Sequence, residues 1–556
     1  MIKTDKLTET EGRKVVNLLV LAIFAIGMGI FLIVMPKYSD DIRFVGAFRD
    51  WFSGQGVRYF TYGGNPFKAG IPWDGLVATW ETLYYGDNAR LSNIVATVFM
   101  LFPKWVGASI CLICLLWTLR VEAEFLGIRL SRSRLTPMIV AGWVLFLPWS
   151  NQMSSLVFQF NYIIPTFLSY ILLRRLFKGR PGERIWVTAL VALLLGMFHE
   201  AYSLPFIAGL TASAILFRKN RSGKYVAAIV CLTAGLLWIV LAPSLTHRFT
   251  IAVDYYYLTG PLSMIKRFVK IFMWHPALWI FNALLVAEAM RKNRGTRLRS
   301  PFIVFLFVSV WISIYLSYFT TGEPRVVWFG DMCSALGIFY IMIKDEWFGS
   351  RSGKKMTGVL NAVMSVAMTV VLTITSYCVI RSEREFRAAI DSFVQHPDKP
   401  VYNDWLASYE LNPWVFLSIF DMKVYEFYWI GYPALTGEDL EGNPLKGMIH
   451  FIPEKLRNYS GEEGELLPGE GHVRKVDGYL VTEAIPEIEA AIIGVGRNVP
   501  MDFGWGMKTD TAVVIAPFVS EKNGKRYWFV RIYHRVLDNL IGNVRYVGAI
   551  PGIENE

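Results

Sequence analysis

Residues 15–35 read VVNLLVLAIFAIGMGIFLIVM, and residues 36–44 directly after them read PKYSDDIRF. The first stretch is about 21 residues long, enough to cross the ~30 Å hydrocarbon core of a bilayer as a helix. It lacks a small-residue cleavage site and is too long for the apolar region of a signal peptide, so we expect a retained transmembrane helix. The chain therefore leaves a membrane and at once presents two adjacent carboxylates, Asp40 and Asp41.

Similar apolar segments recur along the chain. Of the 556 residues, 54% are hydrophobic and 18% are charged, whereas soluble domains carry about 25% charged residues. Together with residues 15–35 the segments predict an α-helical polytopic membrane protein of about eleven spans, of which 135–149 and 185–199 are short. The ten further segments are 104–119, 135–149, 162–177, 185–199, 201–217, 225–243, 268–290, 301–319, 326–343 and 357–379.

The basic residues predict the orientation of these spans. A net charge of +11 could indicate nucleic-acid binding, but the Lys and Arg residues lie in short loops between apolar segments, where membrane topology places them. With the N-terminus in the cytoplasm, about half of the 56 basic residues fall in loops that are then inside. We therefore expect a multi-pass protein of the inner (plasma) membrane whose partner is the lipid bilayer, and no nucleic-acid binding.

This orientation puts three large features on the outer face: loop 36–90, loop 244–267 and the tail 380–556. Loop 36–90 is rich in Trp and Tyr, which suits the membrane interface. The tail has strand-like runs separated by Gly, Pro and acidic residues, which predicts a small extracytoplasmic α/β or mainly β domain. All five cysteines lie in apolar segments, so the tail has no disulfide framework. We expect two domains, 1–379 and 380–556.

Ionisable groups at the membrane boundary are costly, and they often face a cavity or a partner. In the Asp40–Asp41 pair the side chains of neighbouring residues point in different directions, so one could act as a general base while the other binds an arginine, a metal or a hydroxyl. The alternative is helix capping by Ser39 or Asp40. The residues leave open which aspartate is the base, with a slight preference for Asp41.

Other candidates lie at the outer ends of later segments. His199 and Glu200 form a corner between two apolar segments, and they either bind substrate or cap the corner. Arg325 lies where an outer loop re-enters the membrane, and it either binds a phosphate or lies at the interface as a partner of Glu323. A further polar cluster precedes residue 94 and consists of Asp87, Arg90 and Asn93.

Several nucleotide and hydrolase motifs are absent from the sequence. There is no Walker A motif, no GxGxxG after a strand, no HExxH and no GxSxG. Because the outer compartment lacks nucleotides, an activated substrate would have to arrive through or within the membrane.

Four short motifs, in this order and all expected on the outer face, resemble the GT-C superfamily of polytopic membrane glycosyltransferases. They are YSDDIRF after the first span, GDNARLSN before the second, GMFHE in mid-chain and GEPR before a late span. The resemblance extends to bacterial proteins of surface-polysaccharide and lipopolysaccharide decoration. It implies transfer of a hexosyl or pentosyl group from a polyprenyl-phosphate donor to a glycan or lipid-linked acceptor at the cell envelope.

The resemblance also implies roles for individual residues. Asp40 or Asp41 would deprotonate the acceptor hydroxyl, and Arg325 would bind the lipid phosphate, with Lys37, Arg43 and Arg90 as weaker alternatives. A transferase of this kind either needs no cofactor or uses a divalent cation (Mg²⁺ or Mn²⁺), which Asp40 and Asp41 would then hold. The alternatives are a lipid-linked polysaccharide polymerase or ligase, and a transporter or flippase of lipid-linked glycans.

Overall fold

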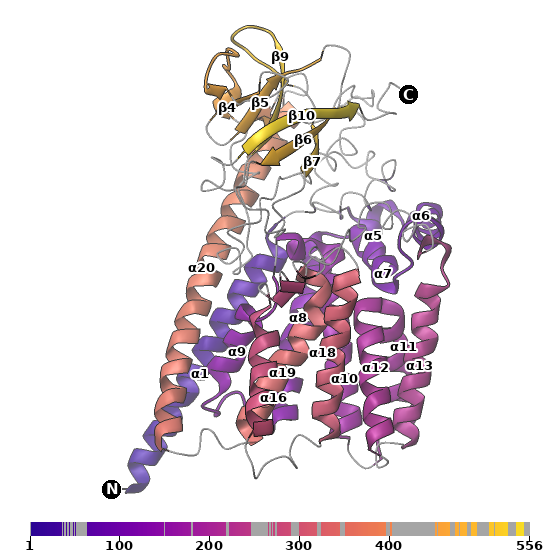
Figure 1. Ribbon diagram of the computed structural model, residues 1–556, viewed down its shortest axis with the longest axis vertical. Helices are drawn as coiled ribbons and strands as arrows, with labels where there is room; N and C mark the ends of the chain where they lie inside the picture. The colour runs from indigo at the N-terminus through magenta and orange to yellow at the C-terminus, as the bar shows by residue number, and fades with distance from the viewer. Residues whose placement is uncertain are drawn as a thin grey trace.

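The computed structural model describes most of the helical part and the strands of the tail (Figure 1). The described residues are 2–35, 37, 41, 44, 48, 51, 64–149, 151–179, 182–217, 222–245, 265, 268–269, 271–272, 275–290, 300–319, 324–344, 351–395, 401–402, 451–452, 454–466, 473–476, 479–485, 491–497, 511–515, 518–531 and 541–549.

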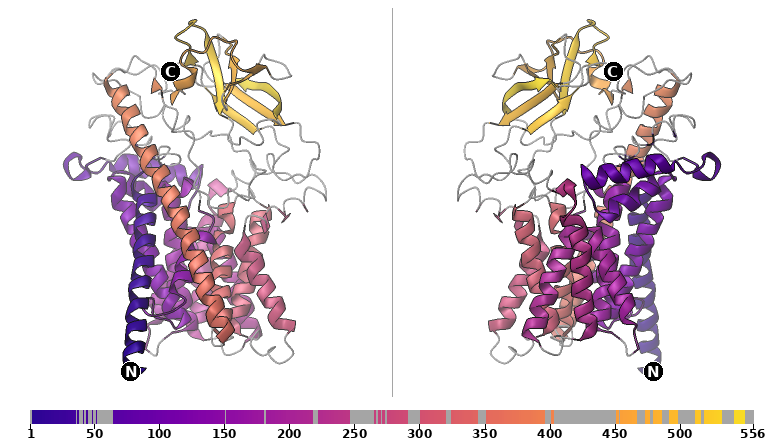
Figure 2. Two further views of the ribbon diagram at one scale, coloured as in Figure 1. Left: turned by 90° about the vertical axis from the view of Figure 1, so that its left-hand side faces the viewer. Right: turned by 90° about the vertical axis from the view of Figure 1, so that its right-hand side faces the viewer.

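The described helices form a bundle whose main members run roughly side by side (Figures 1 and 2). The N-terminus lies at one end of the bundle, and the strands of the tail lie beyond the other end, which we call the sheet end. The short helices α5 (Pro66–Ala69) and α6 (Trp73–Tyr85) lie at the sheet end as well. The bundle helices are α1 (Ile2–Ile33), α7 (Leu91–Met100), α8 (Lys104–Leu126), α9 (Thr136–Leu145), α10 (Leu156–Phe177), α11 (Ile185–Phe198), α12 (Glu200–Leu216), α13 (Gly223–Val240), α16 (Pro276–Met290), α18 (Pro301–Phe319), α19 (Trp328–Lys344) and α20 (Arg351–Gln395).

Seven of the described helices are long and apolar enough to cross a membrane: α1, α8, α10, α13, α18, α19 and α20. The prediction of a polytopic α-helical membrane protein is confirmed. The other four expected spans are helices too, but α9, α11, α12 and α16 are shorter, with 10 to 17 residues each. Residues 91–100 form the additional short helix α7, which ends before Pro103 because proline cannot continue a helix.

The start of α10 differs from the sequence-based expectation. We expected a loop over 150–161, whereas a single 3₁₀ turn covers Asn151–Ser154 and α10 begins at Leu156. Gln159 and Asn161 lower the hydropathy of this stretch, but both are buried and hydrogen-bonded inside the bundle. The first two turns of α10 are therefore a buried helix that contains two amide side chains, rather than a loop.

The tail follows α20, which runs as one helix through the expected domain boundary at residues 379 and 380. Among its described residues the tail is mainly β, as predicted, with two antiparallel sheets and the short parallel pair β1 (Val401–Tyr402) and β2 (Phe451–Ile452). The five-stranded sheet has the order β3 (Glu465–Leu466), β4 (Arg474–Val476), β5 (Tyr479–Glu483), β9 (Arg526–Arg531) and β8 (Phe518–Val519). The three-stranded sheet has the order β10 (Ile541–Ala549), β6 (Ala491–Arg497) and β7 (Thr511–Ile515).

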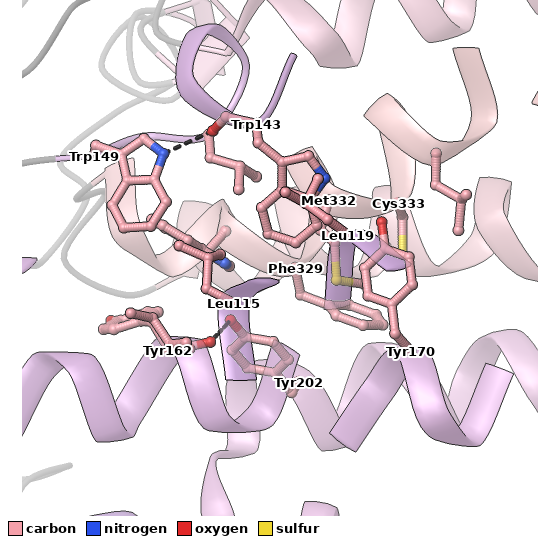
Figure 3. Close-up of a cluster of buried hydrophobic side chains, with 14 of the residues drawn as sticks. Leu115, Leu119, Trp143, Trp149, Tyr162, Tyr170, Tyr202, Phe329, Met332 and Cys333 are labelled. Carbon is pink, nitrogen blue, oxygen red and sulfur yellow. Dashed lines mark hydrogen bonds between the residues drawn. The ribbon is translucent and has the colours of Figure 1, made fainter. Parts of the chain in front are cut away.

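Aromatic side chains form a buried cluster inside the bundle (Figure 3). The indole of Trp149 donates a hydrogen bond to the carbonyl oxygen of Trp143 at 2.7 Å, and the hydroxyl of Tyr202 donates to the carbonyl oxygen of Tyr162 at 2.8 Å. Trp328 packs against Tyr162, with 5.7 Å between ring centroids. The indole N–H groups of Trp149 and Trp328 and the hydroxyl of Tyr202 are thus hydrogen-bonded within the bundle, as buried polar tips of aromatic side chains usually are.

Candidate functional site

Asp41 of the first loop is hydrogen-bonded to the start of α10. Its Oδ2 accepts a hydrogen bond from the backbone N–H of Leu156, and its Oδ1 accepts one from Val157, both at 2.8 Å. The first N–H groups of a helix have no partner within the helix, and a carboxylate there also interacts favourably with the helix dipole. Asp41 is fully buried. It therefore caps α10 from a distant part of the chain.

Two buried lysines accompany this carboxylate. The ammonium of Lys37 donates to the carbonyl oxygen of Met100, at the end of α7, and that of Lys104 donates to the carbonyl oxygen of Ser154 at 2.5 Å. Burial raises the pKa of Asp41, while the charges of both lysines and the two backbone hydrogen bonds act in the opposite direction. Burial lowers the pKa of Lys37 to about 7, against the attraction of Asp41. We call Lys37, Asp41 and Lys104 the anchor cluster.

Arg90 of the polar cluster before α7 and Glu200 of the corner between α11 and α12 form an ion pair. Nε of Arg90 lies 2.7 Å from Oε2 of Glu200, and a terminal nitrogen of Arg90 bonds the other carboxylate oxygen, which makes the pair bidentate. Asp87 is half-buried in the loop before Arg90, and its negative charge also favours charged Arg90. The backbone just before Arg90 is held by Trp238 of α13, whose indole donates to the carbonyl oxygen of Ala89 at 3.0 Å.

His199 caps α12, so the capping interpretation of the corner is correct for this residue. Its Nδ1 accepts a hydrogen bond from the backbone N–H of Ala201 at 3.1 Å, and the side chain is only 2% exposed. An imidazole whose Nδ1 accepts a hydrogen bond carries its proton on Nε2 when it is neutral. The ring packs against Tyr162 of α10, with 5.2 Å between ring centroids.

Asn93 joins α7 to α10 inside the bundle. Its Oδ1 accepts a hydrogen bond from Nδ2 of Asn161 at 2.8 Å, and the side chain is buried. The hydroxyl of the neighbouring Ser92 lies within hydrogen-bond reach of two acceptors that share its one proton, Oδ1 of Asn161 and, at 2.8 Å, the carbonyl oxygen of Phe198. Asn93 thus holds the start of α7 in place by contacts to other protein groups.

Arg325 lies in the 3₁₀ turn Pro324–Val327 that precedes α19. The central carbon of its guanidinium group lies 4.6 Å from the ring centroid of Phe158, a cation–π contact on the first turn of α10. The side chain is half-buried at the sheet end.

The described candidates share one neighbour, the segment 156–162 of α10. Asp41 bonds Leu156 and Val157, and Arg325 covers Phe158. Asn93 bonds Asn161, and His199 packs on Tyr162 and leads into the Glu200–Arg90 pair. Asp40 and Arg43 lie outside the described residues. Segments that are far apart in the sequence thus meet on two turns of one helix.

The anchor cluster does not fit a divalent cation. Magnesium and manganese prefer several oxygen ligands, whereas both oxygens of Asp41 accept backbone N–H groups and two ammonium groups act on it. Within the described part of the chain, no group of three or more His, Cys, Asp or Glu side chains could hold a metal. We therefore derive no chemical step through a metal ion.

Sequence reasoning missed several residues of this region. It did not single out Lys104, although this lysine directly follows Pro103 at the boundary of an apolar segment. It also missed the buried pair of His275 and Asp331, whose Nδ1 and Oδ2 lie 2.5 Å apart and join α16 to α19. An ionisable residue inside an apolar segment was the available signal for Asp331. No sequence signal marks Phe158 or Tyr162 apart from other aromatic residues.

Comparison with solved structures finds matches to this chain. No family model matches the chain, and no curated protein matches it in sequence. The chain is similar to the crystal structure of ArnT from Cupriavidus metallidurans bound to undecaprenyl phosphate, with 12% identity and a TM-score of 0.34. The superposition covers 70% of this chain and 82% of that chain.

Proposed function

We propose that this protein is a membrane glycosyltransferase that works at the sheet end of its bundle. It would move a hexosyl or pentosyl group from a polyprenyl-phosphate donor to a glycan or lipid-linked acceptor on the extracytoplasmic face. The supporting observation is the convergence of the first loop, Arg90–Glu200, His199 and Arg325 on residues 156–162 of α10. Described residues from each of the four GT-C-like motifs thus lie near this segment, whereas the rest of the first-loop motif, with Asp40 and Arg43, lies outside the described residues.

The proposed reaction needs a base and a positive group. A first-loop aspartate takes the proton of the acceptor hydroxyl, whose oxygen then bonds the anomeric carbon of the sugar. The bond between that carbon and the phosphate oxygen breaks, and the polyprenyl phosphate leaves with the electron pair. A cation near the phosphate stabilises the charge that develops on this oxygen.

Arg325 is our first candidate for the phosphate. Arg90 is held in a bidentate pair by Glu200, so its charge is already compensated in this structure. The guanidinium group of Arg325, in the turn before α19, lies over the ring of Phe158 at the start of α10, and its planar shape suits the oxygens of a phosphate. We assign Arg90, Glu200 and His199 to the wall of the site, where they fix the start of α7 and α12.

The proposal is tested by measuring the mass of the surface glycan in the natural host. We expect deletion of the gene to remove one sugar residue from the surface glycan, measured by mass spectrometry, and the wild-type gene to restore it. Arg325→Ala should restore roughly 1% or less of the product. Arg325→Lys should restore more than Arg325→Ala, because lysine keeps the positive charge but cannot bind two phosphate oxygens at once as a guanidinium group does. Abundance of each variant in the membrane fraction shows that it inserts.

A matched control is Lys522→Ala, which breaks an exposed ion pair with Glu463 in the tail and should restore the glycan fully. An unchanged glycan mass in the deletion strain contradicts the proposed function. Loss of whole chains rather than one residue would instead support a polymerase or ligase. Accumulation of a complete lipid-linked glycan on the cytoplasmic face would support a flippase.

A further inference from the structure

The short helix α6 at the sheet end exposes large apolar side chains (Figure 1). Its buried side is formed by Leu76, Thr79 and Leu83, and the helix packs against α7. Trp73 and Val77 lie outside the buried side and are 60% and 46% exposed. Because exposed apolar patches mark surfaces that contact a partner or a membrane, this part of α6 is a candidate contact surface.

Two aromatic residues show which way the apolar side of α6 faces. Residues 73, 77, 80 and 84 follow the spacing i, i+4, i+7 and i+11, which places them on one side of a helix. Trp80 donates from its indole to the hydroxyl oxygen of Thr97 at 2.8 Å, and Tyr84 packs on Trp238 with 5.1 Å between ring centroids. Thr97 belongs to α7 and Trp238 to α13, so this side of α6 faces the helix bundle. The first two turns of α6 continue the same side beyond these contacts.

A third side of α6 is acidic. Asp74, Ala78 and Glu81 follow the spacing i, i+4 and i+7, and all three are exposed. Carboxylates are costly to remove from water, whereas Trp73 and Val77 gain by leaving it. The two exposed sides of α6 therefore suit two different environments.

The exposed apolar surface continues onto two spans. Trp105, in the first turn of α8, and Leu241, at the end of α13, are both exposed. Since α8 and α13 are long and apolar enough to cross a membrane, we take these side chains to face lipid. Phe67 of α5 packs against Phe102, two residues before α8, with 5.8 Å between ring centroids. The segment with α5 and α6 thus meets the lipid-facing surface at both ends, next to α8 through Phe67 and at α13 through Tyr84.

We propose that α6 is an interfacial helix whose partner is the lipid leaflet at the sheet end. The side with Trp73 and Val77 lies among the lipid headgroups and upper acyl chains, and the side with Asp74 and Glu81 lies in water. Tryptophan and tyrosine favour this level of a bilayer, and an amphipathic helix binds there with its apolar side in the lipid. The inference does not rest on the proposed reaction.

This placement sets the level of the membrane next to the candidate site. Trp238 packs on Tyr84 of α6, and its indole also donates to the carbonyl oxygen of Ala89, next to Arg90. Loop 86–90 therefore lies at the level of the lipid headgroups, where the phosphate of a lipid-linked donor would also lie.

Single cysteines at adjacent residues test the assignment. Val77→Cys lies on the apolar side and Ala78→Cys on the acidic side, and each full-length variant is labelled with an environment-sensitive fluorophore. The labelled protein is placed in lipid nanodiscs of phosphatidylethanolamine and phosphatidylglycerol. The fluorescence is then quenched either by a spin label on the lipid acyl chains or by iodide in the water. We expect the lipid spin label to quench position 77 severalfold more than position 78, and iodide to show the opposite preference.

A second pair of variants repeats the comparison one turn away on each side, Trp73→Cys on the apolar side and Glu81→Cys on the acidic side. The wild-type chain, labelled in parallel, gives the background from its own five cysteines. A Tm equal to that of the wild-type protein shows that each variant is folded.

Three results would overturn the inference. Equal quenching of both positions by the lipid spin label would place the acidic side in the membrane. Equal quenching by iodide would place the apolar side in water. Protection of position 77 from both quenchers would show that protein, and not lipid, covers this side. None of these results decides the proposed reaction, because that is tested separately on the surface glycan.

Discussion

Folding buries the ammonium group of Lys37, and this burial destabilises its charged form. The side chain is fully buried, and burial lowers its pKa to about 7 from the ordinary value near 10.5. Between these two pH values the unfolded chain binds more protons at this residue than the folded chain does. Stability at this site therefore rises as the pH rises from about 7 to about 10.5, by at most about 1.4 kcal/mol per pH unit.

Lys37→Met should remove this dependence. We expect the Tm of the wild-type protein in detergent to gain several degrees relative to Lys37→Met between about pH 7.5 and pH 9.5. Effects of pH on the rest of the molecule are the same in both proteins, so they cancel in the difference between the two Tm values. Lys355→Met, at an exposed position of α20, controls for the loss of a lysine. A difference in Tm that stays constant over this range would show that Lys37 does not titrate there.

At the scale of elements, the crossing of α11 and α13 sets the geometry of the site. A Cβ atom on Gly235 would lie 2.4 Å from the carbonyl oxygen of Leu193 and 2.8 Å from Cα of Gly196. One turn beyond Gly235, Trp238 holds the backbone next to Arg90, and three residues beyond Gly196 the chain reaches His199. The close contact of the two glycines thus brings both partners of the Arg90–Glu200 pair to the same place.

Gly235→Ala should therefore destabilise the protein, by about 1–3 kcal/mol, because the two backbones must move apart. The matched control is Gly358→Ala in α20, where no atom lies within 4 Å of the added Cβ. There the substitution should raise the stability slightly, since alanine favours a helix by about 0.5–1 kcal/mol over glycine. Thermal unfolding in detergent measures both, and equal Tm values for the two variants would refute the packing argument.

The apolar segments predicted the helices well because the bilayer requires long apolar stretches, and α18 matches residues 301–319 throughout. The start of α10 could not be predicted, because its cap comes from Asp41 and the burial of Gln159 and Asn161 depends on tertiary contacts. The candidate residues were predicted as a group at one end of the bundle. Their partners were not, since the Arg90–Glu200 pair joins residues 110 positions apart.

For the whole molecule, the elements that carry the candidate site and the strands of the tail lie toward the same end of the bundle (Figure 1). The basic loops between spans connect helices at the opposite end, for example the loop that joins α8 to α9. Because lysine and arginine favour the cytoplasmic side, we propose that the sheet end faces the extracytoplasmic side. The proposed reaction requires that orientation, since it takes a lipid-linked donor and an acceptor outside the cytoplasm.

Single cysteines test the orientation directly. Lys522→Cys lies in an exposed turn of the tail, and Arg129→Cys lies at an exposed position between α8 and α9. We expect a membrane-impermeant maleimide to label Lys522→Cys in intact cells, and Arg129→Cys only after permeabilisation. The wild-type chain, whose five cysteines at 111, 114, 231, 333 and 378 lie in bundle helices, gives the background. The reverse pattern would place the site in the cytoplasm and would contradict a reaction that draws its donor from the outer leaflet.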